Sequence, residues 1–209
     1  MHNIEREFKW DATAGNAFED FVKAIQMHSN QVDFVGAVDI TDYYLDDKQH
    51  SLSNQKVALR IRHCGNLWQA TLKSRSQLRK GLAVRQEFTV GLSPARSFRK
   101  ALSILEKRSV WQGVLLAGLQ ERFRICNHRQ IYQCVYQRCV CEAALDNYVT
   151  VFGGHRMRRK EIELELKKGN AKCFAQFVKK ISLASNLKAA KISKVAGAEK
   201  WILEKISSN

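Results

Sequence analysis

The stretch Glu161-Ile162-Glu163-Leu164-Glu165-Leu166 alternates carboxylates with aliphatic side chains. Because successive side chains of a β-strand point to opposite faces, this pattern predicts a strand with one acidic face and one apolar face. Neighbouring glutamates on the acidic face would stand about 7 Å apart. Taken alone, such a strand is most simply an edge or surface strand whose charged face is solvated.

Several other stretches repeat this alternation, with charges of both signs. Near the N-terminus, Glu5, Glu7 and Lys9 share one strand face and Phe8 lies on the other. The remaining stretches with this spacing are Leu59-Arg60-Ile61-Arg62, Thr71-Leu72-Lys73 and Arg85-Gln86-Glu87. Like charges aligned on one face repel unless counterions or metals lie among them. The acidic strands therefore need cations, and the basic strands need anions.

These patterns predict an α+β fold with a largely antiparallel sheet. Strand-like alternation occurs in residues 3–9, 32–44, 57–63, 67–73, 83–90, 120–126, 131–145 and 161–167. Helices are expected after Asn16, after Ser93-Pro94, after Asn170 and from Ile192 onward, because apolar residues recur there at helical spacing. We expect the strands to close into a β-barrel with a charged interior and peripheral helices, because this places opposite charges together and leaves no sheet edge exposed.

The chain is predicted to form one domain over residues 1–209. Its length suits a single core, and it has only one proline and no repeat or low-complexity segment. No apolar window is long enough for a membrane span and no signal-like start is present, so we expect a cytoplasmic protein without a membrane partner. The six cysteines lack zinc-site spacing and are interpreted as reduced thiols.

The formal charge of +15 predicts a polyanionic partner, which could be nucleic acid, an acidic membrane or a phosphorylated small molecule. The charged strand faces favour the small molecule. The basic stretch 154–160 is interpreted as a solvated loop, so nucleic-acid binding is the less favoured alternative. The sequence makes no prediction of an oligomeric state.

Taken together and in order, these motifs resemble the triphosphate tunnel metalloenzymes, also called the CYTH superfamily. The ExExK motif of that family is matched by Glu5-Arg6-Glu7-Phe8-Lys9, and its LRIR strand by Leu59-Arg60-Ile61-Arg62. The other similar elements are Thr71-Leu72-Lys73, Arg85-Gln86-Glu87, Arg129 with Tyr132, Glu142-Ala143-Ala144-Leu145-Asp146, the acidic stretch at 161–166 and Ser193-Lys194. The resemblance covers nearly the whole chain and implies the eight-stranded antiparallel tunnel of the family.

The resemblance also implies roles for the charged side chains. The expected ligands of one or two Mg²⁺ or Mn²⁺ ions are Glu5, Glu7, Glu161, Glu163 and Glu165. The expected phosphate-binding residues are Lys9, Arg60, Arg62, Lys73, Arg85, Arg129 and Lys194. Glu87 and Glu165 are candidates for orienting the attacking water, while Glu142 and Asp146 are candidates for further tunnel acids. Glu87 could equally be structural and pair with a tunnel arginine.

The expected activity is metal-dependent hydrolysis of a triphosphate. Inorganic tripolyphosphate, cleaved to pyrophosphate and phosphate, is the simplest substrate because it requires no pocket for a base. Within the family, the alternatives are a class IV adenylyl cyclase, in which a ribose hydroxyl replaces water, and a thiamine triphosphatase. A module that only binds polyphosphate or nucleotides is an alternative of another class, and the glutamates argue against it because they would repel the anion.

Overall fold

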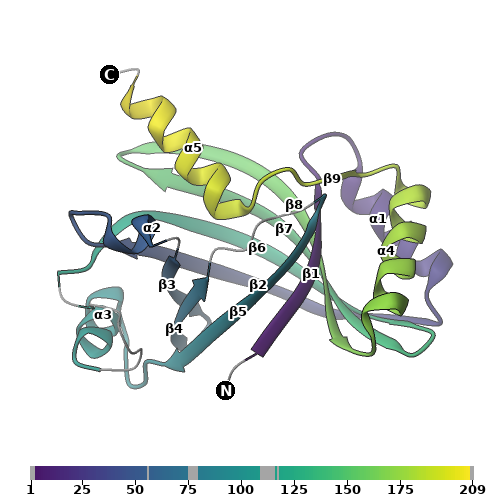
Figure 1. The fold of residues 1–209 in the computed structure, drawn as a ribbon, viewed down its shortest axis with the longest axis horizontal. Helices are drawn as coiled ribbons and strands as arrows, with labels where there is room; N and C mark the ends of the chain where they lie inside the picture. Colours follow the sequence, from purple (N-terminus) through teal and green to yellow (C-terminus); the bar gives the residue numbers. More distant parts are fainter. Residues whose placement is uncertain (1–2, 56, 75–79, 109–115, 117, 208–209) are drawn as a thin grey trace.

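The computed structural model of the protein is built around one antiparallel sheet (Figure 1). It describes residues 3–55, 57–74, 80–108, 116 and 118–207, although not the side chains of residues 3, 4, 74, 85 and 86. The strands within these ranges are β1 (Asn3–Asp11), β2 (Gln31–Asp46), β3 (Val57–Cys64), β4 (Leu67–Ser74), β5 (Leu82–Gly91), β6 (Gln120–Tyr136), β7 (Cys139–Phe152), β8 (His155–Lys168) and β9 (Lys188–Ala189). The helices there are α1 (Ala17–His28), α2 (Ser51–Asn54), α3 (Phe98–Glu106), α4 (Ala171–Ser185) and α5 (Lys194–Ile206).

The sheet curls until its two sides meet at β1. Its strand order is β5-β4-β3-β2-β6-β7-β8-β1-β9, and β1 also pairs with β5. Among the described residues, only Glu7 and Phe8 of β1 have partners in both β5 and β8. Beyond them, β9 takes the place of β5 beside Trp10 and Asp11.

The predicted α+β architecture with an antiparallel sheet is therefore confirmed, but the eight-stranded closed barrel needs correction. Nine strands are present in the described chain, and the sheet is open along much of β1. The reason is that β1 changes partners along its length, because its first half pairs with β5 and its second half with β8.

The aliphatic strand faces point outward and are covered by helices. Trp10 of β1, Phe21 of α1 and Phe177 of α4 are fully buried in one apolar cluster. Leu59 and Ile61 of β3 are buried in a second cluster. Burial of side chains of this size contributes roughly 1.5–3 kcal/mol each. The apolar partners of the charged residues thus form the core, and the charged faces point inward.

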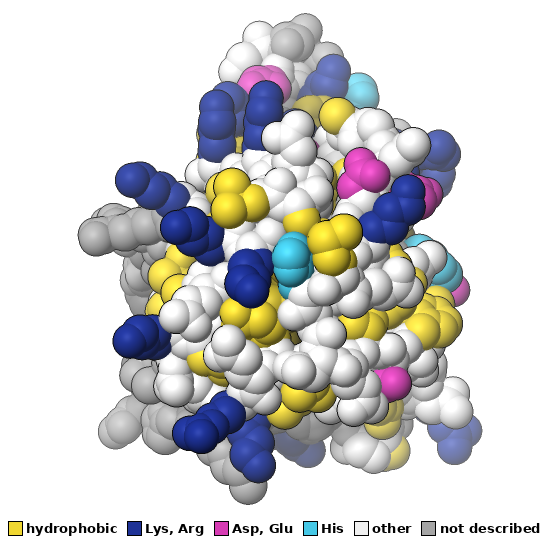
Figure 2. Space-filling model, turned by 90° about the vertical axis from the view of Figure 1, so that its right-hand side faces the viewer, with side chains coloured by type: hydrophobic (Ala, Val, Ile, Leu, Met, Phe, Trp, Pro, Cys, Tyr) yellow, Lys and Arg dark blue, Asp and Glu magenta, His cyan; other side chains and the backbone are white. Residues whose placement is uncertain are grey.

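Most of the basic excess lies on the outside of the molecule. Figure 2 shows the side on which α1 and α4 lie, where Lys and Arg side chains outnumber Asp and Glu. α4 itself carries Lys172, Lys179 and Lys180 without an acidic residue. The net charge of the chain therefore gives little information about the interior of the sheet.

α5 packs against the inner face of the sheet, unlike α1, α3 and α4. Its residues Ala198 and Ile202 are buried with Phe123, Ile125 and Tyr148. Phe123 and Ile125 share their strand face with Arg129, as the alternation of β6 requires. α5 consequently covers part of the concave surface (Figure 1). Its first residue, Lys194, lines the charged interior.

Two strand boundaries differ from the predicted ones. The predicted strand 131–145 crosses a tight turn at Gln137, which has a positive φ of 52°, and it therefore belongs partly to β6 and partly to β7. The basic stretch 154–160 is not a loop, because β8 begins at His155. Pairing with β7 extends this strand well before its acidic part.

The start of α3 also differs from the prediction, since this helix begins at Phe98 and not after Ser93-Pro94. The reason is local capping, because the Ser97 side chain accepts a hydrogen bond from the Lys100 backbone N–H. The predicted cap of α4 is confirmed, with Asn170 accepting from the Cys173 backbone N–H at 2.9 Å. In the part of the chain that is described, no helix is both long and apolar enough to cross a membrane.

Candidate functional site

The inner face of the sheet encloses a cavity of about 290 Å³, which is lined almost entirely by charged side chains. The predicted site residues that line it are Glu5, Glu7, Lys9, Arg60, Arg62, Lys73, Glu87, Arg129, Glu142, Glu163, Glu165 and Lys194. They come from seven strands and from the first turn of α5. The strand residues point inward because the alternate residues of their strands are packed under the outer helices.

Two of the predicted residues whose side chains are described do not line this cavity. Glu161 and Asp146 lie behind its wall, where they meet Glu163. The backbone of Arg85 pairs with Glu5 in β1, but its side chain lies outside the described part of the structure. Its role in phosphate binding stays a prediction.

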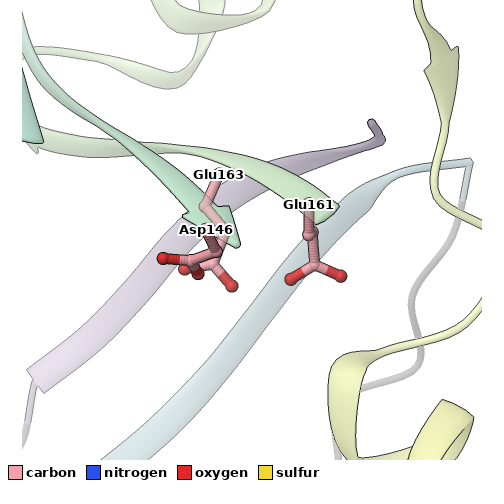
Figure 3. Close-up of side chains that lie close together, drawn as sticks. All are labelled: Asp146, Glu161 and Glu163. Atoms are coloured by element: carbon pink, nitrogen blue, oxygen red, sulfur yellow. The ribbon is translucent and has the colours of Figure 1, made fainter. Parts of the chain in front are cut away.

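Asp146, Glu161 and Glu163 form a compact acidic cluster (Figure 3). One carboxylate oxygen from each lies within 4.8 Å of the other two. The cluster forms because Asp146 of β7 pairs directly with Glu161 of β8, while Glu163 follows on the same strand face. An all-oxygen donor set of this size suits a hard divalent cation such as Mg²⁺ or Mn²⁺. The buried Oε1 of Glu161 accepts no hydrogen bond from the described residues and is available as a ligand atom.

This acidic cluster differs from the predicted metal-binding set. Asp146 was expected only as a further tunnel acid, yet it is one of the three members of the cluster. Glu7 lies beside Lys9, with 3.3 Å between Oε1 and Nζ. Glu165 pairs with Lys167 at 2.7 Å. Glu5, Glu7 and Glu165 line the cavity outside the cluster, and their role as metal ligands stays a prediction.

Three cationic side chains neutralise the acidic cluster. Lys194 places its Nζ 2.5 Å from Asp146 and 3.5 Å from both Glu161 and Glu163. Arg129 donates to both oxygens of Asp146 at 2.6 Å and to Glu163 at 2.7 Å. Lys9 forms an ion pair with Glu163. All six side chains are largely or fully buried, so these contacts are poorly screened by water.

The three carboxylates of the cluster titrate very differently. Burial would raise the pKa of each, but Lys194, Lys9 and Arg129 hold the pKa of Glu163 well below its usual value. At Asp146, Lys194 and Arg129 likewise outweigh burial and lower the pKa to about 2. At Glu161 burial dominates and raises the pKa to about 7, helped by the negative charge of Glu163. Two charged carboxylates thus stand beside a third that exchanges its proton near neutral pH.

The opposite wall of the cavity is basic and is held by one aspartate. Arg62 of β3 donates from Nε and Nη2 to the two oxygens of Asp42 at 2.7 and 2.8 Å, and Arg60 contacts the same carboxylate at 3.3 Å. Although burial acts in the opposite direction, the two guanidinium groups hold the pKa of Asp42 far below its usual range. Asp42 therefore stays ionised and fixes both arginines in place.

Sequence reasoning did not identify Asp42 as a site residue. It lies on β2 directly across from Arg62, and this strand pairing cannot be read from the residues alone. One feature of the sequence could have indicated Asp42. It is a charged residue next to the aromatic Tyr43, and neighbouring strand residues that differ in polarity favour opposite faces.

Glu87 pairs with Lys73, its direct neighbour across β4 and β5. Lys73 is thus one partner of Glu87 in the described part of the structure, and the expected pairing of Glu87 with a tunnel arginine stays a prediction. Lys73 is nonetheless on the cavity wall, where a ligand phosphate could compete for its ammonium group.

Comparison with known proteins agrees with this geometry. The family model described as the CYTH domain matches residues 3–198. An inorganic triphosphatase of Haemophilus influenzae is 27% identical over 155 residues, which cover 72% of this chain and 42% of the relative. The chain thus spans less than half the length of that curated relative.

Two solved structures have a similar fold. One is a Hippeastrum protein that was named for adenylyl cyclase activity and is described as having a dominant triphosphatase activity, with a TM-score of 0.67, 22% identity and coverage of 94% of this chain and 95% of that one. The other is the triphosphatase of the Mimivirus capping enzyme, with a TM-score of 0.51, 11% identity and coverage of 87% and 88%. Because the family match extends over nearly the whole sequence, the chain belongs to the CYTH domain family.

Proposed function

We propose that the chain hydrolyses a triphosphate with the help of a divalent cation, most simply inorganic tripolyphosphate to pyrophosphate and phosphate. The proposal rests on one observation, which is that cationic and anionic side chains face the same cavity. Arg60 and Arg62 form a basic wall, and Arg129 links the cavity to the acidic cluster. The names of the Haemophilus and Hippeastrum proteins support the same activity.

The acidic cluster is the part of the site that would hold Mg²⁺ or Mn²⁺, through Asp146, Glu161 and Glu163. The bound cation would neutralise phosphate charge and make a coordinated water more acidic. Without a ligand, Lys194 and Lys9 contact these carboxylates. Because the cation would neutralise the carboxylates in their place, the two ammonium groups would be free to turn toward the phosphate oxygens.

The basic wall would bind the phosphate chain. A guanidinium group can donate two parallel hydrogen bonds to one phosphate and stays charged at any working pH. Because Asp42 already orients Arg60 and Arg62, little ordering of these side chains is needed when the ligand binds. Lys73 and, from its place on β5, Arg85 would add contacts on the same side.

The composition of the cavity favours an inorganic substrate over a nucleotide or thiamine triphosphate. Its less polar lining consists of Tyr44, Ala144 and Val195, and the other lining residues are charged except for Ser193. A base binds best against apolar or aromatic surface, whereas a bare phosphate chain needs only cationic donors. Glu87 and Glu165 remain our candidates for orienting the attacking water.

A product screen tests the proposal. Purified protein is incubated with tripolyphosphate, ATP or thiamine triphosphate under Mg²⁺ or Mn²⁺, and released phosphate and cyclic nucleotide are measured. We expect phosphate release from tripolyphosphate, loss of release in EDTA, and strong loss in Arg60→Ala. Lys180→Ala, an exposed change on α4, is the matched control and should behave as the unchanged protein. Formation of cyclic AMP as the main product would establish the cyclase alternative instead.

A further inference from the structure

A second pocket of about 330 Å³ adjoins the acidic cluster from the side of Glu161. We call it the back pocket; its walls are the middle of β8, the segment 188–193 and the first turns of α5. Glu161 lines the back pocket and not the cavity, whereas Glu163 lines the cavity and not the back pocket. Figure 3 shows the Glu161 carboxylate set apart from the other two. The acidic cluster thus forms the boundary between two hollows.

Four cationic residues line the back pocket, Arg159, Lys160, Lys188 and Lys191, although Lys160 turns its ammonium group to the opposite face of β8, over the Phe18 ring. The acidic side chains facing them are Asp11 and Glu161. Asp11 accepts a hydrogen bond from the Thr13 backbone N–H at 2.9 Å. The pocket therefore carries more positive than negative charge.

These four cations have no ion-pair partner within the described ranges of the chain. The polar contact of Arg159 there is with the sulfur of Met157 at 3.4 Å, and the ammonium of Lys160 lies 5.2 Å from the Phe18 ring centre. Arg60, Arg62 and Arg129 of the cavity are, by contrast, each bound to a carboxylate. Cations gathered around a hollow without partners repel one another, and an anion placed among them removes this repulsion.

We infer that the back pocket is a second phosphate-binding site, which takes a phosphate or pyrophosphate group beside the acidic cluster. The binding follows from the pocket itself, and only its link to turnover rests on the proposed function. The ligand has two sources: the phosphate that hydrolysis releases, or the far end of a phosphate chain too long for the cavity. Ser193 lines both hollows, so the two ligands would lie on either side of one short segment.

A compact phosphate fits the back pocket better than nucleic acid. The pocket has a volume of about 330 Å³, which suits one or two phosphate groups and not an extended backbone of many phosphates. The exposed Arg156 and Arg158 lie on β8 but do not line the pocket.

Calorimetric titration with pyrophosphate in the absence of metal tests the inference. We expect the unchanged protein to bind a second equivalent, and Lys188→Ala/Lys191→Ala to bind it at least about tenfold more weakly. Lys179→Ala/Lys180→Ala on α4 removes the same charge from the outer surface and should keep both equivalents. Arg60→Ala/Arg62→Ala should lose the cavity equivalent and keep the other.

Two further measurements identify the source of the ligand. If it is the end of a longer chain, Lys188→Ala/Lys191→Ala raises KM for a long linear polyphosphate and leaves KM for tripolyphosphate unchanged. If it is the released product, the same variant weakens inhibition by phosphate. Binding of both equivalents by Lys188→Ala/Lys191→Ala, or displacement of the second one by mixed-sequence RNA alone, would overturn the inference. Absence of hydrolysis with the second equivalent retained would reject the proposed function and not the back pocket.

Discussion

Replacing Arg129 by Met should destabilise the ligand-free protein far more than replacing Arg124, another arginine of the same strand. Arg129 is largely buried and donates three hydrogen bonds of 2.6–2.7 Å to Asp146 and Glu163. Removing one partner from such a buried network leaves uncompensated charge and costs about 3–5 kcal/mol. Arg124 instead pairs with Glu121 while its side chain is 45% exposed, and loss of an exposed pair costs about 0–1 kcal/mol.

The measurement is thermal unfolding of both variants with and without Mg²⁺. For a chain of this size, a loss of 3 kcal/mol lowers Tm by about 6–12 °C. Mg²⁺ should restore more of the Tm of Arg129→Met than it adds to the unchanged protein, because the cation would neutralise the same carboxylates. If Arg129→Met and Arg124→Met unfold within about 1 kcal/mol of each other, the buried charge network does not exist as described.

Three further predictions concern the acidic cluster and its metal. Glu163→Gln should lower turnover by about 100-fold or more, equivalent to ~2.7 kcal/mol of barrier, while binding of tripolyphosphate survives; wild-type turnover in this variant would exclude metal binding on β8. The pKa of Glu161 lies near 7 in the folded chain and is 4.5 ordinarily, so its contribution to stability is present below pH 4.5 and is lost as pH rises through 7. Mn²⁺ affinity should rise over the same interval because the metal displaces that proton, and Glu161→Gln should remove the slope in a titration between these pH values. Ca²⁺ should inhibit phosphate release under Mg²⁺, because its longer bonds misplace the phosphate; equal rates with the two metals would contradict this.

The alternation of charge in β1, β3 and β8 was enough to predict which side chains point inward. Strand alternation is a local property, and Glu7, Arg62 and Glu163 occupy the inner face as their neighbours in sequence indicate. The aliphatic partners of these residues, such as Ile61 and Leu164, are buried under the outer helices for the same reason. The overall class of fold and most of the cavity lining could therefore be read from sequence.

The contacts within the site could not be read in this way, because they depend on pairing between distant strands. Asp146 meets Arg129 because β6 and β7 pair in one particular register, and a shift of one strand by one residue would turn its side chain to the other face of the sheet. The turn at Gln137 sets that register, and the period-two pattern runs through it without a break. Sequence alone also does not show which face of the sheet α5 covers, because the apolar face of a helix can pack against either one.

The position of α5 has a consequence for the order in which the chain matures. Lys194 is contributed by a segment made after all the strands that carry the three carboxylates. A chain growing from its N-terminus therefore holds Asp146 and Glu161 without this ammonium group until the last helix docks. Before docking, the carboxylates have only Lys9 and Arg129 from the group of cations that later surrounds them, and the back pocket lacks one wall. A divalent cation bound before α5 docks would neutralise the same carboxylates that Lys194 contacts afterwards. The ion could therefore assist folding before any substrate binds.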